Sequence, residues 1–141
     1  MSQSLSFVLF FAAILIFAGL LFIVITFTKR TSRHLNVEKY RSDWIKIDQS
    51  LHKDDAASYQ LSVLNADKLL DRAMQDKGIQ GETMGARMKS LQTTWSNANA
   101  VWGAHKLRNQ IAHESDVAVN YETARRALAA FKQALKDVGA I

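Results

Sequence analysis

With 141 residues, the chain has room for one modest domain and one appended segment. Its lack of cysteine excludes disulfide bonds and cysteine-ligated metal sites. Its lack of proline leaves the predicted helices without their strongest breaker.

The net charge of +5 is unevenly distributed along the chain. Six basic and two acidic side chains fall within residues 29–46, a surplus of +4. The basic ones are Lys29, Arg30, Arg33, Lys39, Arg41 and Lys46. From residue 47 onward, twelve basic and eleven acidic side chains leave only +1. Charge alone therefore gives little support for a nucleic-acid-binding surface on the folded part.

Residues 7–27 form an uncharged run of 21 residues, which predicts a transmembrane helix. At helical rise this run spans roughly 32 Å, about the hydrocarbon thickness of a bilayer. The rival interpretation is a secretory signal, but residues 1–6 carry no charged side chain and no A-x-A pattern follows the run. We expect a permanent anchor over residues 1–29 and a basic juxtamembrane segment over residues 30–36.

The orientation of this anchor follows from the charges beside it. Lys29, Arg30 and Arg33 lie directly after the run, and no charged residue precedes it. The positive-inside rule then predicts a single-pass protein of the cell membrane, with its N-terminus outside and its C-terminal domain in the cytoplasm. A functional interpretation of the same basic cluster is attraction to anionic lipid. Its presence is already explained if it sets the topology and its long side chains reach the headgroup region.

Four amphipathic helices are predicted after the anchor. The first starts near Val37 and either continues the membrane helix or follows a short bend. The second runs from about Asp55, a plausible N-cap, to Lys77, and Gly78 suits the position that ends it. The third covers about 97–113, and the last about 120–138. The apolar positions are Val37, Tyr40, Trp44, Ile47 and Leu51 in the first helix, Tyr59, Leu61, Val63, Leu64, Ala66, Leu69, Leu70 and Ala73 in the second, and Tyr121, Ala124, Leu128, Phe131, Leu135 and Val138 in the last.

Three glycines between the second and third helices, Gly78, Gly81 and Gly85, invite comparison with a phosphate-binding loop. They follow a helix rather than a strand, and no G-K-[ST] closes the pattern. We expect a loop that leads into a short helix over about 83–91.

The predicted fold class is all-α: a single N-terminal transmembrane helix followed by an antiparallel four-helix bundle over residues 37–141. Trp44, Trp95 and Trp102 are expected in or near its core.

The third helix changes character at "HKLRNQIAHE", residues 105–114. On a helical wheel, Arg108, Asn109 and His113 point in broadly the same direction as His105. The same face of the helix is apolar in its N-terminal half. Burying these polar groups without partners would cost several kcal/mol. They must meet another helix, water, a second subunit or a ligand.

This residue set suits phosphodiester cleavage without a metal. A histidine can shuttle a proton near neutral pH, and an arginine fork can hold a phosphate. We expect no metal or cofactor, because the sequence has no HExxH and the histidines lack carboxylates at ligand spacing. The structural alternative is that His113 or Asn109 satisfies the end of the helix and that Arg108 pairs with an acidic residue across the bundle. Its candidate partners are Asp67, Asp71 and Glu122.

The segment "LRNQIAH", residues 107–113, resembles the R-φ-x3-H signature of the HEPN superfamily in its common R-N-x3-H form. Arg108, Asn109 and His113 match the three signature positions, late in the third main helix of a small helical bundle. The pattern "ADKLLDRAM…GETMGARMK…W…AHKLRNQIAHE…ARRAL" also resembles an uncharacterised family of short single-pass membrane-anchored bacterial proteins. The HEPN resemblance covers about residues 37–141.

The resemblance implies two classes of function. Catalytic HEPN domains are metal-independent ribonucleases in which two domains pair their motif helices and build a composite site. By position, His113 would be the acid/base, Arg108 the phosphate contact and Asn109 the orienting group, with His105 a secondary candidate outside the signature. The partners would be the lipid bilayer, a second copy of the chain and RNA. Other HEPN domains are not enzymes, so the alternative is a membrane adaptor or accessory subunit that dimerises or binds a protein through the polar face of the third helix.

Overall fold

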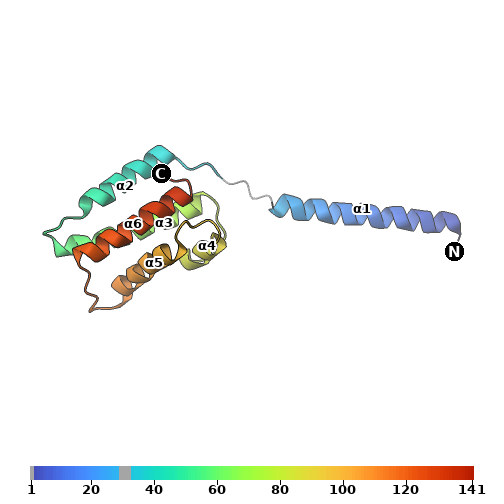
Figure 1. Cartoon of the computed structure of the whole chain (residues 1–141). Helices are drawn as coiled ribbons and strands as arrows, with labels where there is room; N and C mark the ends of the chain where they lie inside the picture. Colours follow the sequence, from blue (N-terminus) through green and yellow to red (C-terminus); the bar gives the residue numbers. More distant parts are fainter. Residues whose placement is uncertain (1, 29–32) are drawn as a thin grey trace. The chain divides into compact units, whose positions relative to one another are not determined.

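The computed structural model describes residues 2–28 and 33–141, and this part of the chain is all-helical (Figure 1). It divides into two compact units, one up to residue 32 and one from residue 33 to the C-terminus. The first unit contains α1 (Gln3–Thr28). The second contains α2 (Val37–Ser50), α3 (Ala56–Asp76), α4 (Met84–Ser90), α5 (Ala98–His113) and α6 (Tyr121–Asp137). Lys29 and Arg30, at the predicted boundary between anchor and juxtamembrane segment, lie outside the described residues.

Helix α1 is long and apolar enough to cross a membrane. Its stretch Gln3–Thr26 has a mean hydropathy of 3.2, and none of it is buried within the protein. The Thr26 hydroxyl donates a hydrogen bond to the carbonyl of Phe22 at 2.7 Å. This bond satisfies the polar group within the helix itself, which suits an apolar surrounding. The orientation of the helix in a membrane stays a prediction.

The first bundle helix is separate from α1, because residues 33–36 are not helical. Asn36 caps α2 and accepts a hydrogen bond from the Lys39 backbone N–H at 3.1 Å. Asparagine is among the preferred N-cap residues, because its side chain satisfies an N–H that the helix leaves unpaired. Of the two alternatives open from the sequence, the non-helical residues 33–36 exclude the continuous helix.

The predicted helix ends are confirmed at both ends of α3 and at the start of α6. Asp55 Oδ1 accepts from the Ala57 N–H at 3.0 Å, and Asn120 Oδ1 accepts from the Thr123 N–H at 2.8 Å. Gly78 follows α3 with φ 83°, in the left-handed region that favours glycine at this position. The short predicted helix is α4, which Thr83 caps.

Helix α3 is central to the core, since it packs against α2, α5 and α6, while α5 also packs against α6. These four helices lie side by side in Figure 1. The predicted apolar faces supply most of the core. As expected, Trp44 and Trp95 are buried in it, and Trp102 is partly buried and packs against the core cluster. The largest fully buried side chains are Phe131, Leu70, Met74, Met88, Leu128 and Leu135.

Two predicted core positions are wrong. Leu61 is 56% exposed, because on a helical wheel it lies about 160° from Val63, on the opposite side of α3 from the core. Its neighbour Ser62 is fully buried instead and donates to the Ser58 carbonyl at 2.6 Å. Val37 is also exposed, since it is the first residue of α2 and precedes Tyr40, where the core contact of this helix begins.

Candidate functional site

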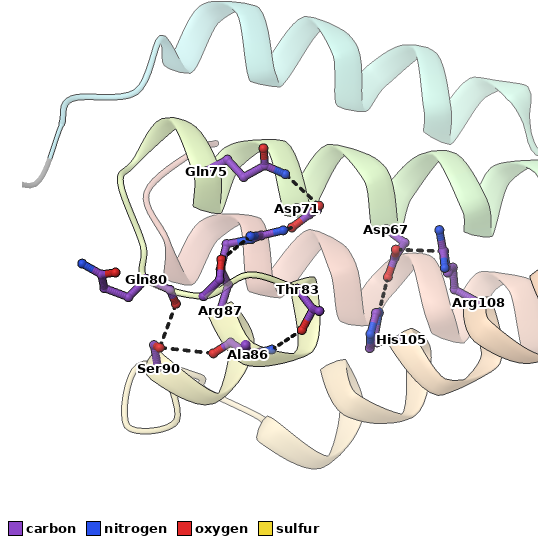
Figure 2. A network of polar contacts seen from close by, with 11 residues as sticks. Asp67, Asp71, Gln75, Gln80, Thr83, Ala86, Arg87, Ser90, His105 and Arg108 are labelled. Carbon is purple, nitrogen blue, oxygen red and sulfur yellow. Dashed lines mark hydrogen bonds and ion pairs between the residues drawn. The ribbon is translucent and has the colours of Figure 1, made fainter.

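The polar half of α5 lies against α3 at a buried carboxylate. Asp67 belongs to the core-facing side of α3 and is only 3% exposed. His105 Nδ1 lies 2.7 Å from Asp67 Oδ1, and Arg108 Nε lies 3.2 Å from Oδ2 (Figure 2). A buried carboxylate is costly unless it is paired, and these two side chains from one turn of α5 supply the pairing.

The two contacts with Asp67 differ in kind. The His105 contact is a hydrogen bond, whereas Nε of Arg108 is buried and has no hydrogen-bond partner of good geometry despite its 3.2 Å distance. The Arg108–Asp67 contact is therefore an ion pair whose N–H is poorly aligned with the oxygen. It still places a positive charge beside the buried carboxylate.

Asn109 connects these two residues on the side away from Asp67. Its Oδ1 accepts a hydrogen bond from Arg108 Nη1 at 3.0 Å, and its Nδ2 lies 3.4 Å from His105 Nε2. The four side chains of Asp67, His105, Asn109 and Arg108 thus form a closed circuit of contacts, here called the polar ring. Arg108 Nη2 makes no hydrogen bond within residues 2–28 and 33–141, and this side of the guanidinium is here called the free edge.

The polar ring lines an open groove of about 810 Å³ between α3, the start of α4 and α5. Lys68 and Asp71 of α3 and Thr83 and Gly85 beside α4 also line this groove. Lys68 is exposed and forms no ion pair with any residue that the structure describes. Two residues with cationic side chains, Lys68 and Arg108, therefore line the groove. Such an arrangement can bind an anion.

The other acidic residue of the groove is already neutralised. Buried Arg87 of α4 contacts Asp71 Oδ1 through Nε at 2.9 Å and Nη2 at 2.7 Å, and its Nη1 donates to the Gly81 carbonyl at 2.7 Å (Figure 2). This arginine ties the loop before α4 to α3. Gly81 has φ 147°, and a Cβ there would lie 2.6 Å from the Arg87 backbone nitrogen. The conformation of the loop before α4 therefore depends on a glycine at this position.

The structure brings together Arg108, Asn109 and His105 but not His113. His113 is the last residue of α5, is exposed, and has a side chain without a polar contact in the described part of the chain. Of the three acidic partners considered for Arg108, the structure has Asp67, because Asp71 pairs with Arg87. Within residues 2–28 and 33–141, no three histidine or acidic side chains gather as a metal-binding group.

Lys68 is the groove residue that sequence reasoning missed. Its position next to Asp67 was the available signal, because an acidic residue between Ala66 and Leu70 on an apolar face indicates a buried carboxylate that needs a partner. Lys68 follows Asp67 directly in the sequence and lines the same groove. Nothing in the spacing of Lys68 alone distinguishes it from an ordinary surface lysine.

Comparison of the chain with protein-family models, with curated proteins and with solved structures finds no match. The HEPN resemblance rests on the signature residues in 107–113 and on their place in a helical bundle.

Proposed function

We propose that the chain is a membrane-anchored HEPN-like domain that cleaves RNA without a metal. The observation that carries this proposal is the position of two signature residues in an open groove. Arg108 and Asn109 are hydrogen-bonded to each other at 3.0 Å, and the guanidinium keeps its Nη2 edge free. A guanidinium held in place by a carboxylate and an amide is suited to receive a phosphate at its remaining edge.

His113 fits the proposal as a group that a second molecule completes. It lies one turn beyond Asn109 on α5, exposed and without a polar partner among the described residues. We infer that α2, α3, α5 and α6 form the antiparallel four-helix arrangement of HEPN domains and that two copies pair through α5. Pairing would bring His113 next to a groove, and the shared membrane raises the effective concentration of the two copies.

The chemistry would be transesterification at an RNA phosphate. The 2′-oxygen attacks phosphorus while His113 removes the 2′-hydroxyl proton, the P–O5′ bond breaks, and the proton passes from His113 to O5′. Arg108 would stabilise the charge that develops on the phosphate oxygens. The products would be a 2′,3′-cyclic phosphate and a 5′-hydroxyl. DNA would be resistant because it lacks the attacking hydroxyl.

A second candidate is a non-enzymatic membrane adaptor or accessory subunit. The observation that favours it is the internal pairing of Arg108 with buried Asp67, which balances both charges without a substrate. A polar face that is already satisfied can serve as a docking surface for a second copy or another protein. In this case His113 would take part in binding the partner and would not transfer a proton.

The two candidates are separated by an RNA cleavage assay on the full-length chain in lipid nanodiscs. Mixed RNA is incubated with the wild type and with His113→Ala, with and without EDTA. His52→Ala is the matched control, because the His52 side chain is also exposed and without a polar contact in the described part. We expect cleavage by the wild type and the control, with or without EDTA, and none by His113→Ala. RNA that stays intact with all three proteins would exclude the nuclease and favour the adaptor.

A further inference from the structure

The polar ring has a defined direction of hydrogen bonding. Arg108 Nη1 can only donate, so the Asn109 atom that faces it at 3.0 Å is the oxygen. This fixes the amide and turns Asn109 Nδ2, a donor, toward His105 Nε2 at 3.4 Å. His105 Nε2 must then be the bare, accepting nitrogen, and the proton of the imidazole lies on Nδ1, where it is donated to Asp67.

The ring therefore requires a neutral His105 in one tautomer. A proton on Nε2 would face the Asn109 amide with a second donor. Rotating that amide to offer its oxygen would in turn place its NH2 group against Arg108 Nη1. Either change opens the ring at Asn109, the residue that holds the guanidinium from the side opposite Asp67.

We propose that His105 is a positioning residue that directs the free edge of Arg108 into the groove. The histidine occupies one oxygen of Asp67, which leaves the other oxygen for Arg108, and it holds Asn109 in the orientation that accepts from Arg108. Both of its ring nitrogens are engaged within the polar ring, by Asp67 and by Asn109, so it acts on the substrate through Arg108. The role in RNA binding rests on the function proposed above, whereas the geometry of the ring does not.

A pair of substitutions at His105 distinguishes positioning from packing. Glutamine carries a donor group and an acceptor group in its amide, as the ring requires, whereas phenylalanine keeps an aromatic ring but offers neither. We measure binding of a 2′-O-methyl RNA oligonucleotide, which cannot be cleaved, to the full-length chain in nanodiscs. The affinity should fall about tenfold or more with His105→Phe, since misplacing a binding group by about 1 Å is costly, and His105→Gln should recover most of it. Both variants must keep the helical content of the wild type.

The effect must also depend on Arg108. In an Arg108→Ala background, His105→Phe should cause no further loss of RNA affinity, because the residue it positions is absent. An undiminished loss in that background would overturn the proposal, and so would equal affinities of the Phe and Gln variants.

Nuclear magnetic resonance tests the ring independently of RNA. In the full-length chain in detergent micelles, ¹⁵N spectra should show His105 with its proton on Nδ1, and the Arg108 Nε–H signal should move with His105→Phe and return with His105→Gln. An Nε2–H tautomer, or an Arg108 signal that ignores both substitutions, would overturn the proposal. If the wild type neither binds nor cleaves RNA, the proposed nuclease fails, and these spectra still decide whether His105 positions Arg108.

Discussion

The carboxylate of Asp67 lies 2.7 Å from the imidazole of His105, a residue 38 positions later in the chain. This contact joins the middle of the central helix α3 to the polar half of α5, next to the groove. One buried carboxylate thereby connects the stability of the bundle with the arrangement of the candidate site.

Replacing Asp67 should test this connection through stability. Asp67→Ala removes the shared partner of His105 and Arg108 and leaves a buried guanidinium nitrogen without its counter-charge. Because the Arg108 side chain is partly exposed to water, we expect a loss of about 1–3 kcal/mol of unfolding free energy. Urea unfolding in detergent micelles, followed by tryptophan fluorescence, measures the loss, since all three tryptophans lie in the bundle.

The control for this measurement is Asp54→Ala, which removes an exposed carboxylate without a polar contact in the described part of the chain. It should change the free energy of unfolding by less than about 0.5 kcal/mol. An Asp67→Ala variant as stable as this control would show that the polar ring does not stabilise the fold.

A pair of glycine variants tests the conformation of the loop before α4. Gly81→Ala forces a side chain into φ 147° and places its Cβ 2.6 Å from the Arg87 nitrogen, which should cost about 2 kcal/mol or more. Gly103→Ala, within α5, meets no atom within 4 Å and should stabilise the protein by about 0.5–1 kcal/mol. Thermal melting of both variants gives the comparison. The opposite order would contradict the described conformation of the loop.

The local part of the fold was predictable because it depends on neighbouring residues. Asp55, Thr83, Asn97 and Asn120 cap their helices through contacts two or three residues away, and such contacts can be read from spacing. Leu61 was misassigned because hydrophobicity alone does not say which side of α3 is covered. Its wheel position, far from Val63, was the better indicator.

The site was only partly predictable, because its partners are distant in the sequence. A helical wheel places Asn109 and His113 on the same side of α5, yet only Asn109 lines the groove. Which residues of α5 join the site depends on the position of Asp67 on α3. The periodicity of α5 gives no information about the position of Asp67. His105 lies outside the HEPN signature, and its hydrogen bond to Asp67 is likewise a tertiary contact.

Asp137 gives a prediction about pH. Burial raises the pKa of its carboxyl, but hydrogen bonds from the Ser96 hydroxyl and N–H and from Gln133 outweigh burial, and the pKa lies below its usual range. A carboxylate whose pKa is lowered by folding stabilises the protein above its unfolded pKa, near 4, and this stability is lost as the pH falls through the folded pKa. Asp137→Asn should therefore cost about 1 kcal/mol at pH 7 and progressively less below about pH 4.

Urea unfolding across this pH range measures the effect, with Asp54→Asn as the control for loss of an exposed carboxylate. A difference between wild type and Asp137→Asn that does not shrink below pH 4 would mean that the carboxylate charge is not responsible.

The topology of the anchor is testable with reporter fusions. Because the basic residues follow α1 and none precedes it, a cytoplasmic reporter fused after Ile141 should be active and an export-dependent reporter should be inactive. Replacing Arg33 and the adjacent basic residues Lys29 and Arg30 with glutamine, while adding lysines near Ser2, should weaken or reverse this preference. An exported C-terminus in the wild-type chain would separate the domain from cytoplasmic RNA and remove the setting that the proposed nuclease needs.

Arg108→Lys is the sharpest test of how the groove would act on a phosphate. Lysine keeps the positive charge beside Asp67, but it cannot contact Asp67, Asn109 and a phosphate at once through a planar fork. We expect cleavage to fall by about 100-fold or more while the melting temperature changes little, because the buried carboxylate keeps a counter-charge. Lys106→Arg is the matched control, since Lys106 is exposed on the same helix and lies outside the groove lining. Cleavage by Arg108→Lys at the wild-type rate would show that charge alone suffices and that the fork geometry of Arg108 has no catalytic role.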